Sequence, residues 1–192
     1  MALLIIKKTI VKKNVVISVL LLLTANVYSQ TYMSRTVFIG FYSKTPLEDI
    51  IAETQQAYAV VDVAKKQLAF TVLLKGFEFK KELMQTHFNE NYVESDKYPK
   101  ASFTGSFNNN INANGEATEI QINGTLTLHG LSKNINVPAT VQIINEKLTG
   151  HATFTVKPED FNISIPSLVR EKIASEMKVE VKLNADQIKN NQ

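Results

Sequence analysis

The chain has 192 residues, enough for one domain, and it contains no cysteine, which excludes thiol nucleophiles, thiolate zinc sites and iron–sulfur clusters. It carries 21 basic and 18 acidic residues, a net charge of +3, but four of the lysines lie within the first 13 residues. The rest of the chain therefore has 17 basic and 18 acidic residues. Because a positive field supplies much of the affinity of proteins for nucleic acid, this balance argues against a nucleic-acid partner.

Residues 1–29 have the pattern of a secretory signal peptide. The four lysines precede an apolar run at residues 15–23, and small or branched residues follow at 27–29. A membrane anchor needs about 20 apolar residues, roughly twice the length of this run. We expect cleavage between Ser29 and Gln30, which would leave a mature chain in the periplasm or secreted, without an integral membrane segment.

Most of the remaining chain shows period-two alternation of apolar and polar residues. This pattern is typical of β-strands that bury one face, since successive side chains of a strand point to opposite sides. The predicted strands cover residues 37–41, 57–63, 68–74, 101–107, 120–128, 135–143, 148–156 and 177–183.

Two segments have helical features instead. Apolar residues recur at helical spacing over residues 80–91, where Met84 and Phe88 share a face. If the strands close into a barrel, this helix would either cover the mouth of the barrel as a mobile lid or fill it as a small additional core. A second helix is predicted over residues 46–53, with Thr45 as its N-cap.

Turn signals separate several strands, at residues 112–115, 129–130 and 145–147. Short turns join antiparallel neighbours, so the sheet should be an up-and-down meander. Closing such a sheet removes its unpaired edges. We therefore predict an all-β fold, an eight-stranded antiparallel barrel with a short helical insertion, in a single domain over residues 30–192.

An integral outer-membrane barrel would also show alternation over eight strands. Such barrels have aromatic girdles and usually an aromatic C-terminal residue. This chain ends in KNNQ at residues 189–192, and its strands place Thr, Gln, Asn and Lys on the alternate face. The pattern favours a soluble barrel.

Three motifs resemble those of the YceI-like family. GTLTLHGLSK at residues 124–133 resembles the family signature G-x-L-T-x-H-G-x-(S/T)-K. GFEF at 76–79 followed by MQTHF at 84–88 is similar to the helical insertion of the family, and YVESDKYPKASF at 92–103 is similar to the segment after it. The three occur in the family's order, and the resemblance spans about residues 36–184.

The resemblance implies a lipocalin-like barrel, exported to the bacterial periplasm, that holds a polyisoprenoid or another long amphiphile without a cofactor. A barrel of eight strands can instead be filled by its own side chains, so a ligand-free interaction module, for example in a stress response, is the alternative. The sequence leaves open whether the protein forms a homodimer. The candidate ligand contacts are Phe70, Val72, Leu74, Phe79, Met84, Phe88, Phe103, Leu126, Leu128, His129, Phe154 and Met177.

No motif for catalysis or metal binding stands out. The chain has neither a nucleophile elbow nor a paired-carboxylate signature, which favours a binding protein over an enzyme. Its three histidines, His87, His129 and His151, do not show the spacing of a metal site. His129 lies in a tight turn, where it would either contact a ligand head group or act as a structural turn residue.

Overall fold

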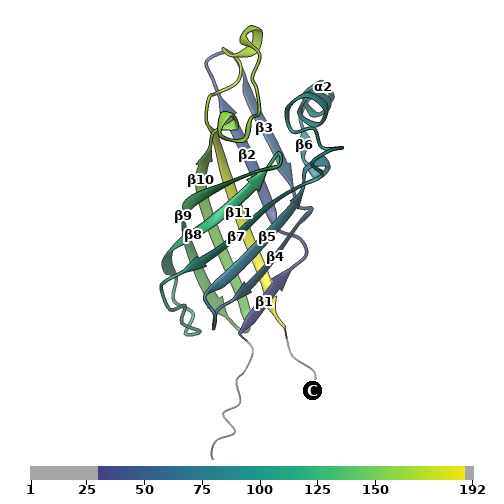
Figure 1. Ribbon diagram of the computed structural model, residues 1–192. Helices are drawn as coiled ribbons and strands as arrows, with labels where there is room; N and C mark the ends of the chain where they lie inside the picture. Colours follow the sequence, from purple (N-terminus) through teal and green to yellow (C-terminus); the bar gives the residue numbers. More distant parts are fainter. Residues whose placement is uncertain (1–29, 189–192) are drawn as a thin grey trace, which may run out of the picture.

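The strands of the protein form one closed antiparallel sheet (Figure 1). The computed structural model describes residues 30–188, so the predicted signal peptide, residues 1–29, lies outside the described residues. Eleven strand segments in this part of the chain pair in the order β1-β4-β5-β7-β8-β9-β10-β11-β2-β3-β6, and β1 also pairs with β11. Their bounds are β1 (Thr31–Ser34), β2 (Phe38–Lys44), β3 (Asp49–Thr54), β4 (Ala57–Asp62), β5 (Gln67–Leu73), β6 (Glu78–Phe79), β7 (Lys100–Phe107), β8 (Thr118–Leu128), β9 (Leu131–Ile144), β10 (Lys147–Val156) and β11 (Met177–Gln187).

Three of the eight strands of the barrel are interrupted, which accounts for the eleven segments. β1 and β2 both pair with β11, so together they make one strand. β3 and β4 make a second strand in the same way, since β4 pairs with β1 and β3 pairs with β2. β5 and β6 make a third, since β5 pairs with β4 and β6 pairs with β3. The predicted eight-stranded antiparallel barrel with up-and-down connections is therefore confirmed.

Two hairpin turns fix the register of β8, β9 and β10. His129 and Gly130 have φ angles of 51° and 77°, and Asn145 and Glu146 have φ angles of 50° and 62°. Two consecutive residues with positive φ are the requirement of a type I′ turn, whose twist matches that of the adjoining strands. The strands consequently pair up to the turn, with Leu128 opposite Leu131.

The helix predicted over residues 46–53 is wrong, because this segment is the turn and second strand of a hairpin. The Thr45 hydroxyl does accept a hydrogen bond from the Glu48 backbone N–H (3.1 Å), as a cap would. It also donates to the Glu48 carbonyl oxygen (3.0 Å), which closes a turn. β3 then begins at Asp49 and pairs with β2. The capping pattern of Thr45 is thus shared by a helix start and by this turn.

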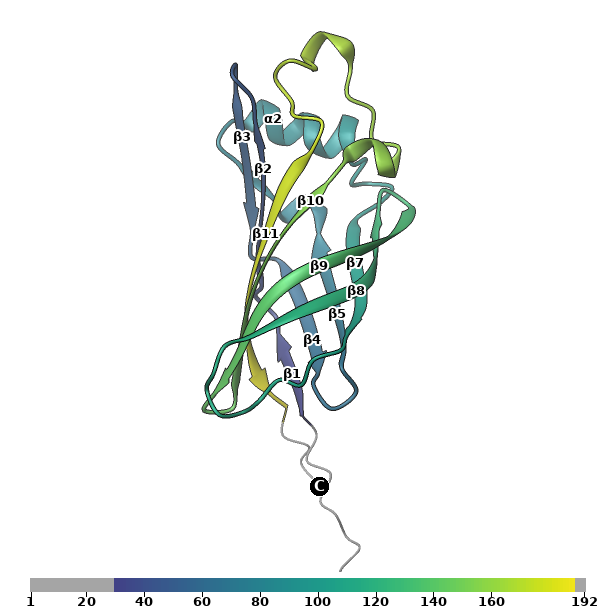
Figure 2. The ribbon, with the colours of Figure 1, turned by 90° about the vertical axis from the view of Figure 1, so that its left-hand side faces the viewer.

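The helical insertion begins close to its predicted position. Helix α2 spans Glu82–His87 and continues into a π-helical turn, Phe88–Tyr92. Figures 1 and 2 place this insertion at the end of the barrel opposite the start of β1 and the end of β11. The long β10–β11 connection, residues 157–176, lies at the same end. None of the helices between residues 30 and 188 is long and apolar enough to cross a membrane.

The opposite end of the barrel has a packed interior. Tyr32 lies beside Val61 in the β1–β4 register, and Leu148 is opposite Ile143 on one side and Ala185 on the other. All five side chains are buried. Burial of a large apolar side chain contributes about 1.5–3 kcal/mol to folding, so this end stabilises the barrel.

A close approach inside the wall requires glycine at position 124. The ring of Phe103 lies over Gly124, so that a Cβ there would meet Phe103 Cζ at 2.5 Å and the Thr104 carbonyl oxygen at 2.6 Å. The backbone oxygen cannot move away as a side chain can. By contrast, a Cβ at Gly150 would meet its nearest neighbours, Leu183 and Val141, at 3.6 Å, an ordinary contact distance.

We expect Gly124→Ala to lower the free energy of unfolding by about 1–3 kcal/mol, because the added methyl group overpacks the wall. Gly150→Ala should change it by less than about 1 kcal/mol in either direction. Thermal unfolding followed by circular dichroism measures both variants. Equal midpoints for the two would contradict the packing described here.

Candidate functional site

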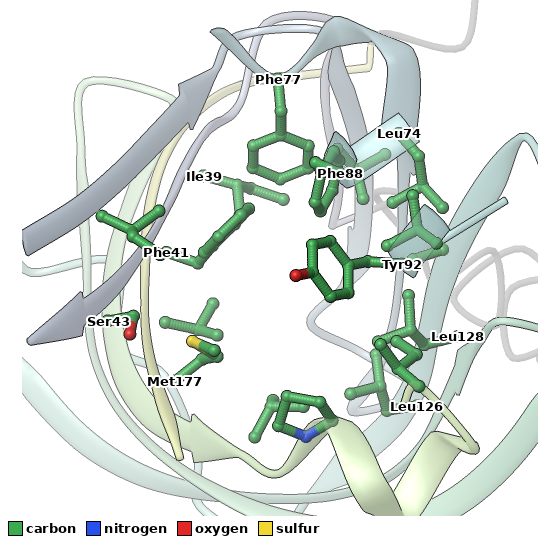
Figure 3. Close-up of a pocket in the computed structure, with 18 of the residues that line it drawn as sticks. Ile39, Phe41, Ser43, Leu74, Phe77, Phe88, Tyr92, Leu126, Leu128 and Met177 are labelled. Atoms are coloured by element: carbon green, nitrogen blue, oxygen red, sulfur yellow. The ribbon is translucent and has the colours of Figure 1, made fainter. Parts of the chain in front are cut away.

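A pocket of about 360 Å³ occupies the half of the barrel next to α2 (Figure 3). Its lining comes from β2, β3 and all the strands from β5 to β11, from the helical insertion and from the β10–β11 connection. The side chains around it are mainly Phe, Leu, Ile, Val and Met. Both the volume and the apolar lining are usual for sites that bind small organic molecules.

Eleven of the twelve sequence-predicted contacts line this pocket. Alternation had placed most of them on one face of the sheet, and closure of the barrel turns that face inward. Their contact with a ligand stays a prediction. The eleven are Phe70, Val72, Leu74, Phe79, Met84, Phe88, Phe103, Leu126, Leu128, Phe154 and Met177.

His129 is the exception, because the structure does not place it among the residues that line the pocket. Its Nδ1 lies 2.9 Å from the carbonyl oxygen of Phe161, and its Nε2 lies 2.7 Å from a carboxylate oxygen of Glu94. Its ring also packs edge-on against Tyr98, with 4.7 Å between centroids. Both partner atoms are hydrogen-bond acceptors, so each ring nitrogen that carries hydrogen has an atom to which it can donate. The type I′ turn directs the His129 ring to these loops, outside the pocket lining. These contacts are those of a structural turn residue.

Sequence reasoning missed the contribution of the β10–β11 connection. Ile163, Ile165, Val169 and Ile173 of this connection line the pocket. The segment holds only two short 3₁₀ turns, Pro158–Phe161 and Ser167–Val169, and otherwise no regular structure. Its apolar residues therefore follow neither the strand nor the helix period, and periodicity could not identify them.

Four phenylalanine rings join the helical insertion to the barrel wall. Phe88 lies 5.3 Å from Phe41, 5.8 Å from Phe77 and 5.1 Å from Phe79, measured between ring centroids. Tilted and edge-on rings at these distances contribute about 0.5–1.5 kcal/mol per pair beyond their burial. The cluster both lines the pocket and holds the π-helical turn in place.

Two polar links connect the elements at the mouth to the β2–β3 hairpin. Lys81, just before α2, forms an ion pair with Glu48. The backbone N–H of Ala174, in the β10–β11 connection, donates a hydrogen bond to the buried hydroxyl of Ser43 (2.8 Å). The bond from Lys81 lowers the pKa of Glu48, and the charge of Lys172 adds to this effect. The hairpin thus supports both segments that cover the mouth.

The other two histidines lie apart from each other. His87 lines the pocket, whereas His151 is exposed and pairs with Glu180 at 3.0 Å on the outside of the barrel. Within residues 30–188, no three His, Cys, Asp or Glu side chains gather closely enough to hold a metal ion.

The family model of the YceI-like domain matches residues 35–185. The chain belongs to this family. The match covers nearly all of the barrel, so the resemblance carried by GTLTLHGLSK and the neighbouring motifs is confirmed. A search of curated proteins found no match to the chain.

Several solved structures share the fold at low sequence identity. A polyisoprenoid binding domain from Saccharophagus degradans, described as implicated in plant cell wall breakdown, has a TM-score of 0.73 at 15% identity over 83% of this chain and 99% of its own. BcnA of Burkholderia cenocepacia has a TM-score of 0.66 at 18% identity, covering 77% and 95%. The YceI protein of Campylobacter jejuni has a TM-score of 0.59 at 20% identity, covering 72% and 85%.

The geometry of His129 leads to a second testable expectation. His129→Asn keeps a residue that tolerates positive φ before Gly130, but it removes the links to Phe161 and Glu94. We expect a loss of about 1–3 kcal/mol in the free energy of unfolding. Lipid affinity, measured by displacement of a fluorescent fatty-acid probe, should stay within about twofold of the wild type, because His129 does not line the pocket. A selective loss of affinity with unchanged stability would restore the ligand-contact interpretation.

Proposed function

We propose that the protein is exported and binds a polyisoprenoid or another long-chain amphiphile in the pocket of its barrel. The observation that carries this proposal is the apolar pocket itself, enclosed by the barrel wall and covered by the helical insertion and the β10–β11 connection. Family membership adds to it, and so does the fold shared with a polyisoprenoid binding domain.

The energetics of this pocket suit a flexible hydrocarbon chain. Each CH₂ group moved from water into an apolar site contributes about 0.8 kcal/mol before the losses of association. Such binding is non-directional, so affinity rises with chain length until the pocket is full.

The contacts of Ser43 and Glu48, two of the polar side chains that line the pocket, favour binding over catalysis. Ser43 accepts a hydrogen bond from Ala174, and Glu48 is engaged by Lys81. Neither contact joins a nucleophile to a general base, the arrangement that covalent catalysis requires. The family and its polyisoprenoid binding neighbour support the same conclusion.

A change that fills the pocket tests the proposal. Ala152 lines the pocket, and Ala69, on β5, is exposed. We expect Ala152→Phe to weaken binding of farnesol or a longer polyprenol by more than about tenfold, since the ring occupies ligand volume, whereas Ala69→Phe serves as the matched control.

Native mass spectrometry and probe displacement provide the measurement. The wild type and Ala69→Phe should carry or take up the polyprenol, and Ala152→Phe should not. A wild type that stays free of lipid after incubation with polyprenols and fatty acids would favour the alternative, a ligand-free interaction module.

Export has its own test. When the full chain is expressed in a bacterium with a periplasm, we expect the mature protein to begin at Gln30, as read by intact-mass analysis of the periplasmic fraction. Replacing Lys7, Lys8, Lys12 and Lys13 with Glu should retain the unprocessed chain in the cytoplasm. A full-length chain in the periplasm would contradict the predicted cleavage.

A further inference from the structure

The ring of Tyr92 stands inside the pocket. Tyr92 is the last residue of the π-helical turn and lines the pocket. Figure 3 shows its ring projecting from the wall towards the middle, with the hydroxyl oxygen on the side of Phe41 and Met177. The phenol thus brings a hydrogen-bond donor into a pocket whose lining is mainly apolar.

This hydroxyl has no hydrogen-bond partner among residues 30–188. Tyr42 shows the contrast, because its hydroxyl lies 3.2 Å from Glu53 and 3.3 Å from Glu180 on the outside of the barrel. Burial alone raises the pKa of Tyr92, so the phenol keeps its proton and can donate it. The hydroxyl is not among the buried side-chain atoms without a partner in residues 30–188, so it borders the open space of the pocket, where an oxygen of a bound molecule can reach it.

The charged groups of the pocket belong to its mouth. Lys81 forms an ion pair with Glu48 of the β2–β3 hairpin, and its hydrogen bond lowers the pKa of Glu48. The positive charge of Lys172, in the β10–β11 connection, lowers this pKa further. Phe41 and Met177, towards which the phenol points, carry no charge. A phosphate or carboxylate placed beside Phe41 and Met177 would lose part of its hydration next to uncharged side chains. A neutral oxygen would not meet this difficulty.

We propose that the Tyr92 hydroxyl donates a hydrogen bond to a neutral oxygen of the bound chain, such as that of an alcohol, ketone or ester. This inference rests on the proposed lipid-binding function and narrows its ligand to a long-chain amphiphile with an uncharged polar group, held inside the barrel. The apolar wall provides affinity for the chain, and Tyr92 selects the oxygen and sets its depth in the pocket.

The test compares three probes of equal chain length, namely farnesol, the hydrocarbon farnesene and farnesyl phosphate. Each is titrated against the wild type, Tyr92→Phe and Tyr58→Phe by displacement of a fluorescent fatty-acid probe. Tyr58, on β4, is 47% exposed and does not line the pocket. Tyr58→Phe removes the same hydroxyl oxygen at this outer position and is therefore the matched control. We expect Tyr92→Phe to weaken farnesol binding by about three- to tenfold and to leave farnesene binding within twofold. Tyr58→Phe should change neither.

Other outcomes are decisive as well. Equal weakening of farnesol and farnesene in Tyr92→Phe would show a packing role and overturn the inference. Farnesyl phosphate as the tightest probe, unaffected by the substitution, would overturn the neutral head group but leave lipid binding intact. A wild type that binds none of the three probes, nor a fatty acid, would overturn the proposed function and this inference with it. In the free protein, Tyr92→Phe should melt no lower than the wild type, and a lower midpoint would show that the hydroxyl has a structural partner.

Discussion

Closure of the sheet is the constraint on which the pocket depends. β11 pairs with β10 along one edge, and along its other edge it pairs first with β2 and then with Tyr32 and Met33 of β1. Without this seam the eight strands would form an open sheet with two unpaired edges and one solvated apolar face. Closure turns that face inward everywhere, so the same backbone hydrogen bonds that complete the barrel also create an apolar space.

The use of that space differs along the barrel. Near Tyr32 and Leu148 the side chains are buried against those of the neighbouring strands, which stabilises the fold. Near Phe88 the walls stay apart, and the helical insertion and the β10–β11 connection cover the gap. A barrel of this size can take either arrangement, and the protein combines the two. The packed core and the pocket thus occupy different halves of one interior.

The sequence predicted the parts of this structure that depend on local periodicity. Phe70, Val72 and Leu74 were assigned to the inner face because alternation marks one side of a strand, and closure made that side the pocket wall. β1 was missed because four residues show too few alternations, and β3 was missed because its turn uses the same capping contacts as a helix. The directions of Tyr92 and His129 depend on a π-helical turn and a type I′ turn. Such directions follow from backbone geometry and tertiary contacts, which composition does not encode.

β1 starts and β11 ends at the packed end of the barrel, where Tyr32 is opposite Gln187, and the mouth lies at the far end. A tag, a carrier domain or a surface attached at either described end of the chain would consequently leave the mouth facing solution. For the proposed lipid binding, both described ends would therefore serve as anchors of an immobilised protein, with ligand exchange on the opposite side.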